Sequence, residues 1–306
     1  MISLPPPVCG LSRMRVLFIL NPKSGHLLRR PGIPRRLQRF IASSLPGASL
    51  AETTAPGHAT VLARQAAADG MECVVAVGGD GTVNEVASGL LGTDSVLGIL
   101  PLGSGNGLAR ELCIPLDLDA ALGNLLTGRP RRIDSGLANG HPFFCTCGTG
   151  FDAHVVQRFN SRVKRGFLAY VQEGLHAWRN YEPARYEVRV DGLSQGLRQA
   201  LFLTVANASQ FGNEARIAPL ARLDDGSLEL VVVRPLSTLQ ALLTTWRLFR
   251  GTLRHGPLTE YFSARAFEVI PGRPGYFHVD GEVRPLEGAL AISLRPKSLS
   301  VLCPAP

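Results

Sequence analysis

The chain has 306 residues, 45% of them hydrophobic, and a formal net charge of +8 that comes almost wholly from arginine. This length predicts one large or two ordinary globular domains, and we favour two. No apolar run in the sequence reaches the ~20 residues of a membrane-spanning helix, and no helix-turn-helix, zinc-finger or RNP-like motif supports nucleic-acid binding. The basic balance suits phosphate-bearing partners.

The cysteines and the N-terminal segment indicate the cellular compartment of the protein. The six cysteines show no paired CxxC spacing, so they predict neither a zinc site nor a disulfide framework, and we expect a cytoplasmic protein. Cys145 and Cys147 lie two residues apart in FFCTCGTG, which indicates a buried structural pair on one face of a strand. Residues 1–13 contain three successive prolines and predict a disordered leader, with Met14 a candidate start.

Residues 14–134 alternate short apolar strands with helices. The strands are continuously apolar, as expected when helices cover both faces of a sheet. We therefore expect a three-layer α/β nucleotide-binding domain with a mostly parallel sheet, whose ligand lies at the carboxyl ends of the strands. The predicted strands are 15–20, 49–54, 72–79 and 96–103, and the predicted helices are 32–45, 57–69 and 82–91.

Residues 135–306 contain longer stretches of alternating apolar and polar residues. These predict antiparallel strands and a β-rich sandwich domain for the second substrate. Two helices, 166–180 and 237–251, are predicted among the strands. Residues 242–250 mix Trp, Phe and Leu with arginines, which is typical of an interfacial helix, and a core helix with solvated arginines is the alternative.

The sequence GGDGTVNE, at 78–85, follows a predicted strand and opens a helix. Glycines let the backbone approach a bulky anion, and a helix N-terminus offers unpaired N–H groups to phosphate. A carboxylate in such a loop is unfavourable beside phosphate unless a cation needs it, so Asp80 is a candidate for organising Mg²⁺ with a triphosphate. The alternative is a simple turn with Thr82 as the helix N-cap.

Two further polar loops are expected on the same rim. LPLGSGNGLAR, at 100–110, also lies between a strand and a helix, and NPKSG, at 21–25, ends the first strand. In a parallel sheet the carboxyl ends of neighbouring strands share one edge, so all three loops can face one nucleotide. None fits GxxxxGK[ST] or GxGxxG, so neither a P-loop nor a dinucleotide fingerprint is supported.

Together, NPKSG, GGDGTVNE and PLGSGNGLAR resemble the three N-terminal signatures of the diacylglycerol kinase catalytic-domain family, which includes sphingosine and ceramide kinases. The resemblance extends from about Arg15 to the C-terminus. It implies an ATP-dependent lipid kinase, working on a membrane lipid as a peripheral protein at the inner membrane surface. The implied nucleotide contacts are Asn21, Thr53, Gly78, Gly79, Asp80, Gly81, Thr82, Asn84, Gly103, Ser104 and Asn106.

Two later segments resemble family motifs as well. ARLDDGSLEL, at 221–230, is similar to the DDGxL segment, which implies a structural Mg²⁺ held by the carbonyls of Arg222, Asp225 and Ser227; a type I′ turn at 225–226 is compatible with it. HVDGE, at 278–282, is similar to the family's DGE, which implies that Glu282 is the general base for the lipid hydroxyl. By itself, DGE predicts only a hairpin turn.

Part of the pattern departs from the family. Gly107 stands where relatives carry a carboxylate, and GSGN is closer to the sphingosine and ceramide kinase branch, so the acceptor lipid stays open. Two rival functions also stay open: another GGDG-type kinase such as an NAD kinase, and a catalytically silent lipid-binding protein. The oligomeric state, including a homodimer, and any regulator are not indicated by the sequence.

Overall fold

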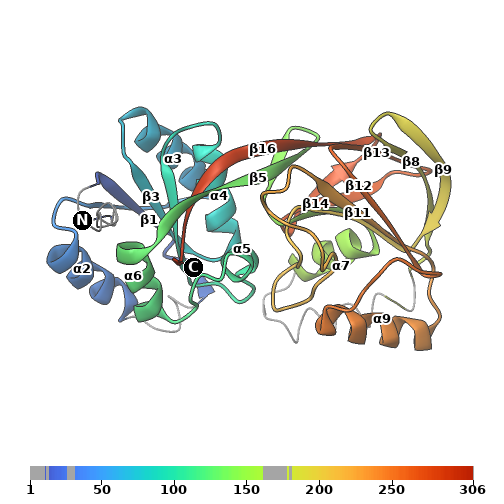
Figure 1. Ribbon diagram of the computed structural model, residues 1–306, viewed down its shortest axis with the longest axis horizontal. Coiled ribbons are helices and arrows are strands. Elements are labelled where there is room, and N and C mark those ends of the chain that lie inside the picture. The colour runs from blue at the N-terminus through green and yellow to red at the C-terminus, as the bar shows by residue number, and fades with distance from the viewer. Residues whose placement is uncertain (1–10, 12–13, 26–31, 161–177, 179–180, 306) are drawn as a thin grey trace, which may run out of the picture. The chain divides into compact units, whose positions relative to one another are not determined.

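The computed structural model describes residues 11, 14–25, 32–160, 178 and 181–305 (Figure 1). The chain forms two compact units, and each is described by itself. Unit 1 comprises the described residues up to Ile133 and those from Ser298 onward, and unit 2 runs from Asp134 to Lys297. The C-terminal residues therefore belong to unit 1, although they follow unit 2 in the sequence.

Unit 1 contains a parallel sheet in the order β2-β1-β3-β4-β16, of which β16 contributes its C-terminal part. Its strands are β1 (Val16–Leu20), β2 (Ser49–Glu52), β3 (Cys73–Gly78), β4 (Val96–Pro101) and β16 (Leu290–Cys303). Its helices are α2 (Ile33–Ser44), α3 (His58–Ala68), α4 (Asp80–Leu90), α5 (Gly107–Glu111) and α6 (Leu118–Thr127).

Helices cover both faces of this sheet, which explains why its central strands are apolar along their whole length. Phe18 and Val75 share one buried cluster with Leu37 of α2 and Leu125 of α6. Helices α3 and α4 pack against β1 and β3 from the other face. Leu11 lies in the segment expected to be a disordered leader, and it is buried in the same cluster as Phe18 and Leu37.

Unit 2 consists mainly of antiparallel strands in two sheets. One has the order β12-β11-β10-β7-β14-β15, and the other contains the N-terminal part of β16 with β13, β8 and β9, and β5 with β6. The strands are β5 (Arg129–Ala138), of which only the part from Asp134 onward belongs to this unit, β6 (His141–Phe143), β7 (Thr146–Gly150), β8 (Ala184–Val190), β9 (Leu193–Ala200), β10 (Phe202–Ala206), β11 (Leu228–Val233), β12 (Thr259–Ala264), β13 (Ala266–Pro271), β14 (Gly275–Val279) and β15 (Glu282–Leu286).

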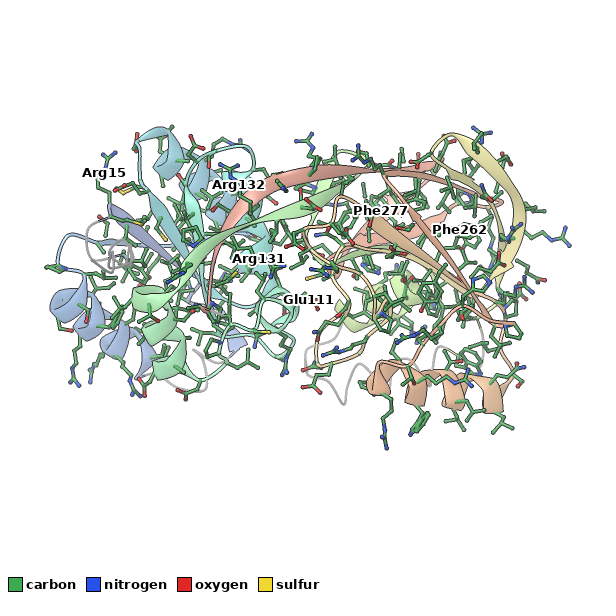
Figure 2. All side chains as sticks on the ribbon, viewed as in Figure 1. Arg15, Glu111, Arg131, Arg132, Phe262 and Phe277 are labelled. Carbon is green, nitrogen blue, oxygen red and sulfur yellow. The ribbon has the colours of Figure 1, made fainter. Side chains whose placement is uncertain are left out.

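The two sheets of unit 2 bury alternate side chains against each other. Phe277 of β14 is buried in this core, and Phe262 of β12 packs against it (Figure 2). Val269 of β13 is buried in the same core. This alternation is the pattern that predicted antiparallel strands. The fold expected from the sequence, a parallel α/β domain followed by a β sandwich, is therefore confirmed.

Two helices accompany the sandwich, α7 (Phe151–Asn160) and α9 (Thr238–Arg250). The helix predicted over 166–180 lies outside the described residues except for Trp178, whereas α9 agrees with the prediction for 237–251 to within one residue at each end. In the part of the chain that the structure describes, no helix combines the length and apolar character needed to cross a bilayer.

Candidate functional site

The structure brings the three polar loops of unit 1 together. They follow β1, β3 and β4, which are hydrogen-bonded neighbours in the parallel sheet. Asn21, at the end of β1, donates its backbone N–H to the Val77 carbonyl at 3.1 Å and its Nδ2 to the Thr82 Oγ1 at 3.0 Å. Two residues 61 positions apart in the sequence are thereby joined at one edge of the sheet.

Asp80 joins the two glycine-rich loops. Its Oδ2 accepts a hydrogen bond of 2.9 Å from the backbone N–H of Asn106, and its Oδ1 accepts one of 2.7 Å from Gly107. Asn106 has a left-handed φ of 51°, and its side chain bonds both the N–H and the carbonyl of Gly103 at 2.9 Å. The carboxylate therefore holds the second loop in shape, a role that the sequence did not predict.

Glycine allows the two loops to approach this closely. A Cβ added to Gly103 would lie 2.7 Å from the Gly79 Cα and 2.9 Å from the Asn106 Oδ1. A Cβ added to Gly105 would lie 2.9 Å from the Asp80 Oδ2. Side chains at these positions would separate the loops, so the contact itself requires glycine.

The N-terminus of α4 lies between these loops. Its N-cap is Gly79, and the first backbone hydrogen bond of the helix runs from Val83 to the Gly79 carbonyl. The N–H groups of the first turn are thus not used within the helix, and Gly81 and Ser104 are exposed beside them. Thr82 is buried inside the helix, so the interpretation that made it the N-cap was wrong. Glycines and free N–H groups fit a phosphate group.

Two further expected nucleotide residues lie nearby in unit 1. Thr53 follows β2, and its backbone N–H donates to the Leu20 carbonyl at 2.9 Å, which places it beside the end of β1. Asn84 lies in the second turn of α4, where its Oδ1 accepts a long hydrogen bond of 3.4 Å from the Ser88 hydroxyl. These contacts do not test whether Thr53 and Asn84 bind a nucleotide, so that role stays a prediction.

The DGE segment lies in unit 2, at the tip of the β14-β15 hairpin. Asp280 and Gly281 have φ values of 46° and 87°, as a two-residue type I′ turn requires. The Asp280 carboxylate accepts three backbone hydrogen bonds of 2.8–2.9 Å, from Phe144, Cys145 and Thr146. Asp280 therefore anchors the turn to the start of β7, a function that the sequence did not reveal.

Glu282 follows this turn as the first residue of β15. Its side chain is 48% exposed, and its Oε2 accepts a long hydrogen bond of 3.4 Å from Arg284. Arg284 also affects His141 in the same region: burial first, and then the positive charge of Arg284, lower the pKa of His141. The centroid of the His141 ring lies 6.3 Å from that of Phe277. The carboxylate of Glu282 is thus held by a neighbouring turn while it remains accessible to solvent.

The DDGxL segment is shaped by Asp134, a fully buried residue at the start of unit 2. The Asp134 carboxylate accepts hydrogen bonds from Gly226 at 2.8 Å and Lys297 at 2.6 Å. Only Gly226 of the pair 225–226 has a positive φ, so the type I′ turn considered for this segment is not formed. The segment is a loop fixed by a distant carboxylate, which no local motif could predict.

A buried polar cluster lies near the DGE hairpin in unit 2. The Asp152 Oδ2 accepts a hydrogen bond of 2.8 Å from Thr204 and lies 3.3 Å from the His278 Nε2. A Cβ on Gly148 would clash with this oxygen, so glycine makes room for the carboxylate. Burial, followed by the charges of Asp152 and Asp280, raises the pKa of Cys147 well above its usual value.

Cys145 and Cys147 of the FFCTCGTG segment are both buried, as expected, but only Cys147 lies in a strand, because β7 begins at Thr146. Among the described residues, no group of three or more His, Cys, Asp or Glu side chains is arranged to hold a metal ion.

Comparison with known proteins identifies the family. Residues 15–138 match the diacylglycerol kinase catalytic domain, and residues 145–303 match the YegS C-terminal NAD kinase beta sandwich-like domain. The diacylglycerol kinase of Bacillus subtilis (strain 168) is 30% identical over 278 residues, which cover 89% of this chain and 90% of the relative. The chain belongs to the diacylglycerol kinase family. This membership confirms the resemblance drawn from the motifs.

Solved structures agree with the family fold. A diacylglycerol kinase from Bacillus anthracis str. Sterne has a TM-score of 0.75 at 21% identity and covers 95% of this chain and 97% of its own. Yeast NADH kinase complexed with NADH has a TM-score of 0.53 at 9% identity, over 99% of this chain and 88% of its own. At these identities the likeness concerns the fold alone.

Proposed function

We propose that this member of the diacylglycerol kinase family transfers the γ-phosphate of ATP to the hydroxyl group of a lipid. The observation that carries the proposal is the Asp80 carboxylate, which bonds the N–H groups of Asn106 and Gly107 and so locks two glycine-rich loops side by side. A rigid, glycine-lined pair of loops next to a helix N-terminus is suited to a polyphosphate.

The nucleotide residues then act in three ways. Gly81 leaves open space for the phosphates, Gly79 and Gly103 let the two loops meet, and Gly78 makes room for the Thr82 side chain. The first turn of α4 donates N–H groups to the phosphates. Asn21 and Thr82, bonded to each other, fix the end of β1 against α4. Ser104, Asn84 and Thr53 are the remaining proposed contacts from the loop, helix and strand end.

Mg²⁺ fits the proposed site through Asp80. When bound, the ion neutralises charge on the phosphates during transfer. Magnesium in such sites is commonly held by one or two carboxylates together with substrate phosphates, which agrees with the single carboxylate of the GGDG loop. Each Asp80 oxygen accepts one backbone hydrogen bond and retains a further lone pair for a cation or its water.

Glu282 is the proposed general base. In the step, the acceptor oxygen forms a bond to the γ-phosphorus while the bond from that phosphorus to the β,γ-bridging oxygen breaks and ADP leaves. The proton of the acceptor hydroxyl passes to the Glu282 carboxylate. A partly exposed carboxylate held at a tight turn can reach a substrate without first breaking a buried contact.

We also propose a structural Mg²⁺ at the carbonyls of Arg222, Asp225 and Ser227. The loop is already fixed through Asp134, and the Asp225 Oδ1 takes up the N–H and hydroxyl of Ser227 at 3.1 and 2.9 Å. With these donors bonded to carboxylates, the loop retains its carbonyls as the oxygen ligands that Mg²⁺ prefers. A melting temperature that a chelator leaves unchanged would remove this ion from the account.

One experiment separates the proposal from its rivals. The protein is incubated with ATP labelled in the γ-phosphate, Mg²⁺, a total lipid extract and NAD. Label in the organic phase supports a lipid kinase, and chromatography of that phase identifies the acceptor class. Label in NADP instead supports an NAD kinase, whereas no transfer with intact lipid binding supports a catalytically silent lipid-binding protein.

A further inference from the structure

Helix α9 turns its apolar side chains outward. Five large hydrophobic residues of this helix are 39% to 67% exposed, and none of its residues is buried: Leu239, Leu242, Leu243, Trp246 and Phe249. Their spacing of three and four residues places them on one face. The opposite, partly buried face carries Gln240, Ala241, Thr244 and Leu248, of which Leu248 packs against the β sheet.

This arrangement reverses the usual amphipathic pattern. A surface helix of a globular protein normally points its larger apolar side chains toward the core. In α9 the face with more apolar surface points away from the sandwich, and in Figure 1 the helix lies at the periphery of unit 2. A contiguous apolar face of this kind marks an interaction surface.

The helix is stable in this exposed position because both of its ends are capped. Ser237 and Gln240 form a reciprocal capping box at the N-terminus, and Gly251 ends the helix in the left-handed region with a φ of 63°. The helix therefore keeps its shape with little core packing, so the outward face is presented in a defined conformation.

The surroundings of this face are basic. Arg247 and Arg250 lie in the last turn of α9, and the Arg250 guanidinium lies 5.2 Å from the Trp246 ring centroid. Arg254 follows the helix, and Arg216 lies against its end, since a Cβ on Gly251 would be 3.1 Å from the Arg216 Cδ. No acidic residue occurs in the sequence from position 230 to 259.

We propose that the outward face of α9 docks the protein on an anionic lipid bilayer. Leucine, phenylalanine and tryptophan enter the boundary between head groups and acyl chains, where tryptophan is favoured, and the flanking arginines contact lipid phosphates. A second copy of the chain is a poorer occupant, because it would bring the same arginines into contact with one another. The inference rests on the proposed function, since a lipid acceptor gives such a surface its use.

The test is vesicle flotation without ATP or acceptor. Vesicles of phosphatidylcholine alone are compared with vesicles that also contain phosphatidylglycerol. The variants are Leu242→Glu with Trp246→Glu, and Arg247→Glu with Arg250→Glu. The matched control is Leu193→Glu with Leu197→Glu on β9, because these leucines are 71% and 60% exposed in the same unit.

We expect the wild type and the β9 control to bind phosphatidylglycerol vesicles, and both α9 variants to bind them at least about tenfold more weakly. Circular dichroism melts check that the variants remain folded. Equal binding by wild type and α9 variants, or no binding of anionic vesicles by the wild type, would overturn the proposal. So would a change from dimer to monomer in the α9 variants by light scattering, since the face would then hold a second copy.

Kinase assays separate this inference from the proposed function. With a short-chain acceptor dispersed as monomers, the α9 variants are expected to keep the wild-type rate, because α9 contains none of the proposed site residues. A wild-type protein that binds anionic vesicles but transfers no phosphate to any lipid would contradict the proposed function, while the docking surface would still be supported.

Discussion

The Asp80 Oδ2 accepts a hydrogen bond of 2.9 Å from the backbone N–H of Asn106, and this contact ties the GGDG loop to the GSGN loop. A residue expected to organise Mg²⁺ thus also shapes its own site. The two tasks are compatible, because a carboxylate oxygen has two lone pairs.

Replacing Asp80 with asparagine tests this double role. In Asp80→Asn an amide NH₂ replaces one carboxylate oxygen. This group cannot accept the hydrogen bond from the backbone N–H of Asn106 or Gly107, so two donors face each other. We expect transfer to fall to background and ATP affinity to weaken, with little change in melting temperature because the loops lie at the rim of the sheet. Asp94→Asn, on an exposed carboxylate of the same unit, is the control. Normal turnover in Asp80→Asn would remove this residue from the mechanism.

Asp280 and Glu282 are expected to differ although they are two residues apart. Asp280→Ala removes the acceptor for three backbone N–H groups, from Phe144, Cys145 and Thr146. Because stranding part-buried donors is costly, we expect it to lower the free energy of unfolding by about 2–4 kcal/mol. Denaturant titration measures this loss. An Asp280→Ala protein as stable as the wild type would show that the turn does not need its anchor.

Glu282→Gln is the complementary change. The amide keeps the size of the side chain but cannot accept the acceptor proton, so kcat should fall by roughly 10² to 10⁴ while ATP affinity and stability persist. Glu287→Gln, at an exposed residue just beyond the other end of β15, is the control, and we expect it to keep the wild-type rate. If Glu282→Gln stays within a few-fold of the wild-type kcat, the residue is only part of a hairpin.

Glu260 gives a pH-dependent contribution to stability. Burial acts to raise its pKa, but the hydrogen bonds and charges of Arg234 and Arg198 outweigh burial, and the net pKa is lowered. The stabilisation is therefore complete above the unfolded-state pKa and is lost as the pH falls through the lower folded-state value. We expect Glu260→Gln to melt about 2–4 °C lower than the wild type at pH 7. The difference in melting temperature should narrow as the pH falls below 4.5, the ordinary pKa of a glutamate. A difference that stays constant as the pH falls would contradict the stabilising role of the Glu260 carboxylate.

Much of the fold was predictable because its patterns are local. The continuous apolar run of β3 and the alternation of β8 follow directly from burial on two faces or one. The return of the C-terminal residues to unit 1 was not predictable, because β16 is one unbroken strand whose two ends pair with different strands, β13 and β4. No local pattern shows that a strand changes partners along its length.

The candidate site also has features that the sequence predicts and features that it does not. The meeting of the loops after β1, β3 and β4 follows from the rule that parallel strands end at one edge. The bonds of Asp80, Asp134 and Asp280 to distant backbone N–H groups depend on tertiary contacts between segments 26 to 163 residues apart. A carboxylate next to glycine is a common turn pair in any sequence, so its anchoring role appears only in the folded chain.

The most direct test of the central claim follows both products of one reaction. Purified protein, ATP, Mg²⁺ and a diacylglycerol or sphingoid acceptor in mixed micelles are monitored by phosphorus NMR. We expect lipid phosphate monoester and ADP to appear in equal amounts with one of these acceptors, and neither to appear with Asp80→Asn. ADP that forms only together with inorganic phosphate, or with phosphate on added NAD and none on any lipid, would contradict the assignment of this protein as a lipid kinase.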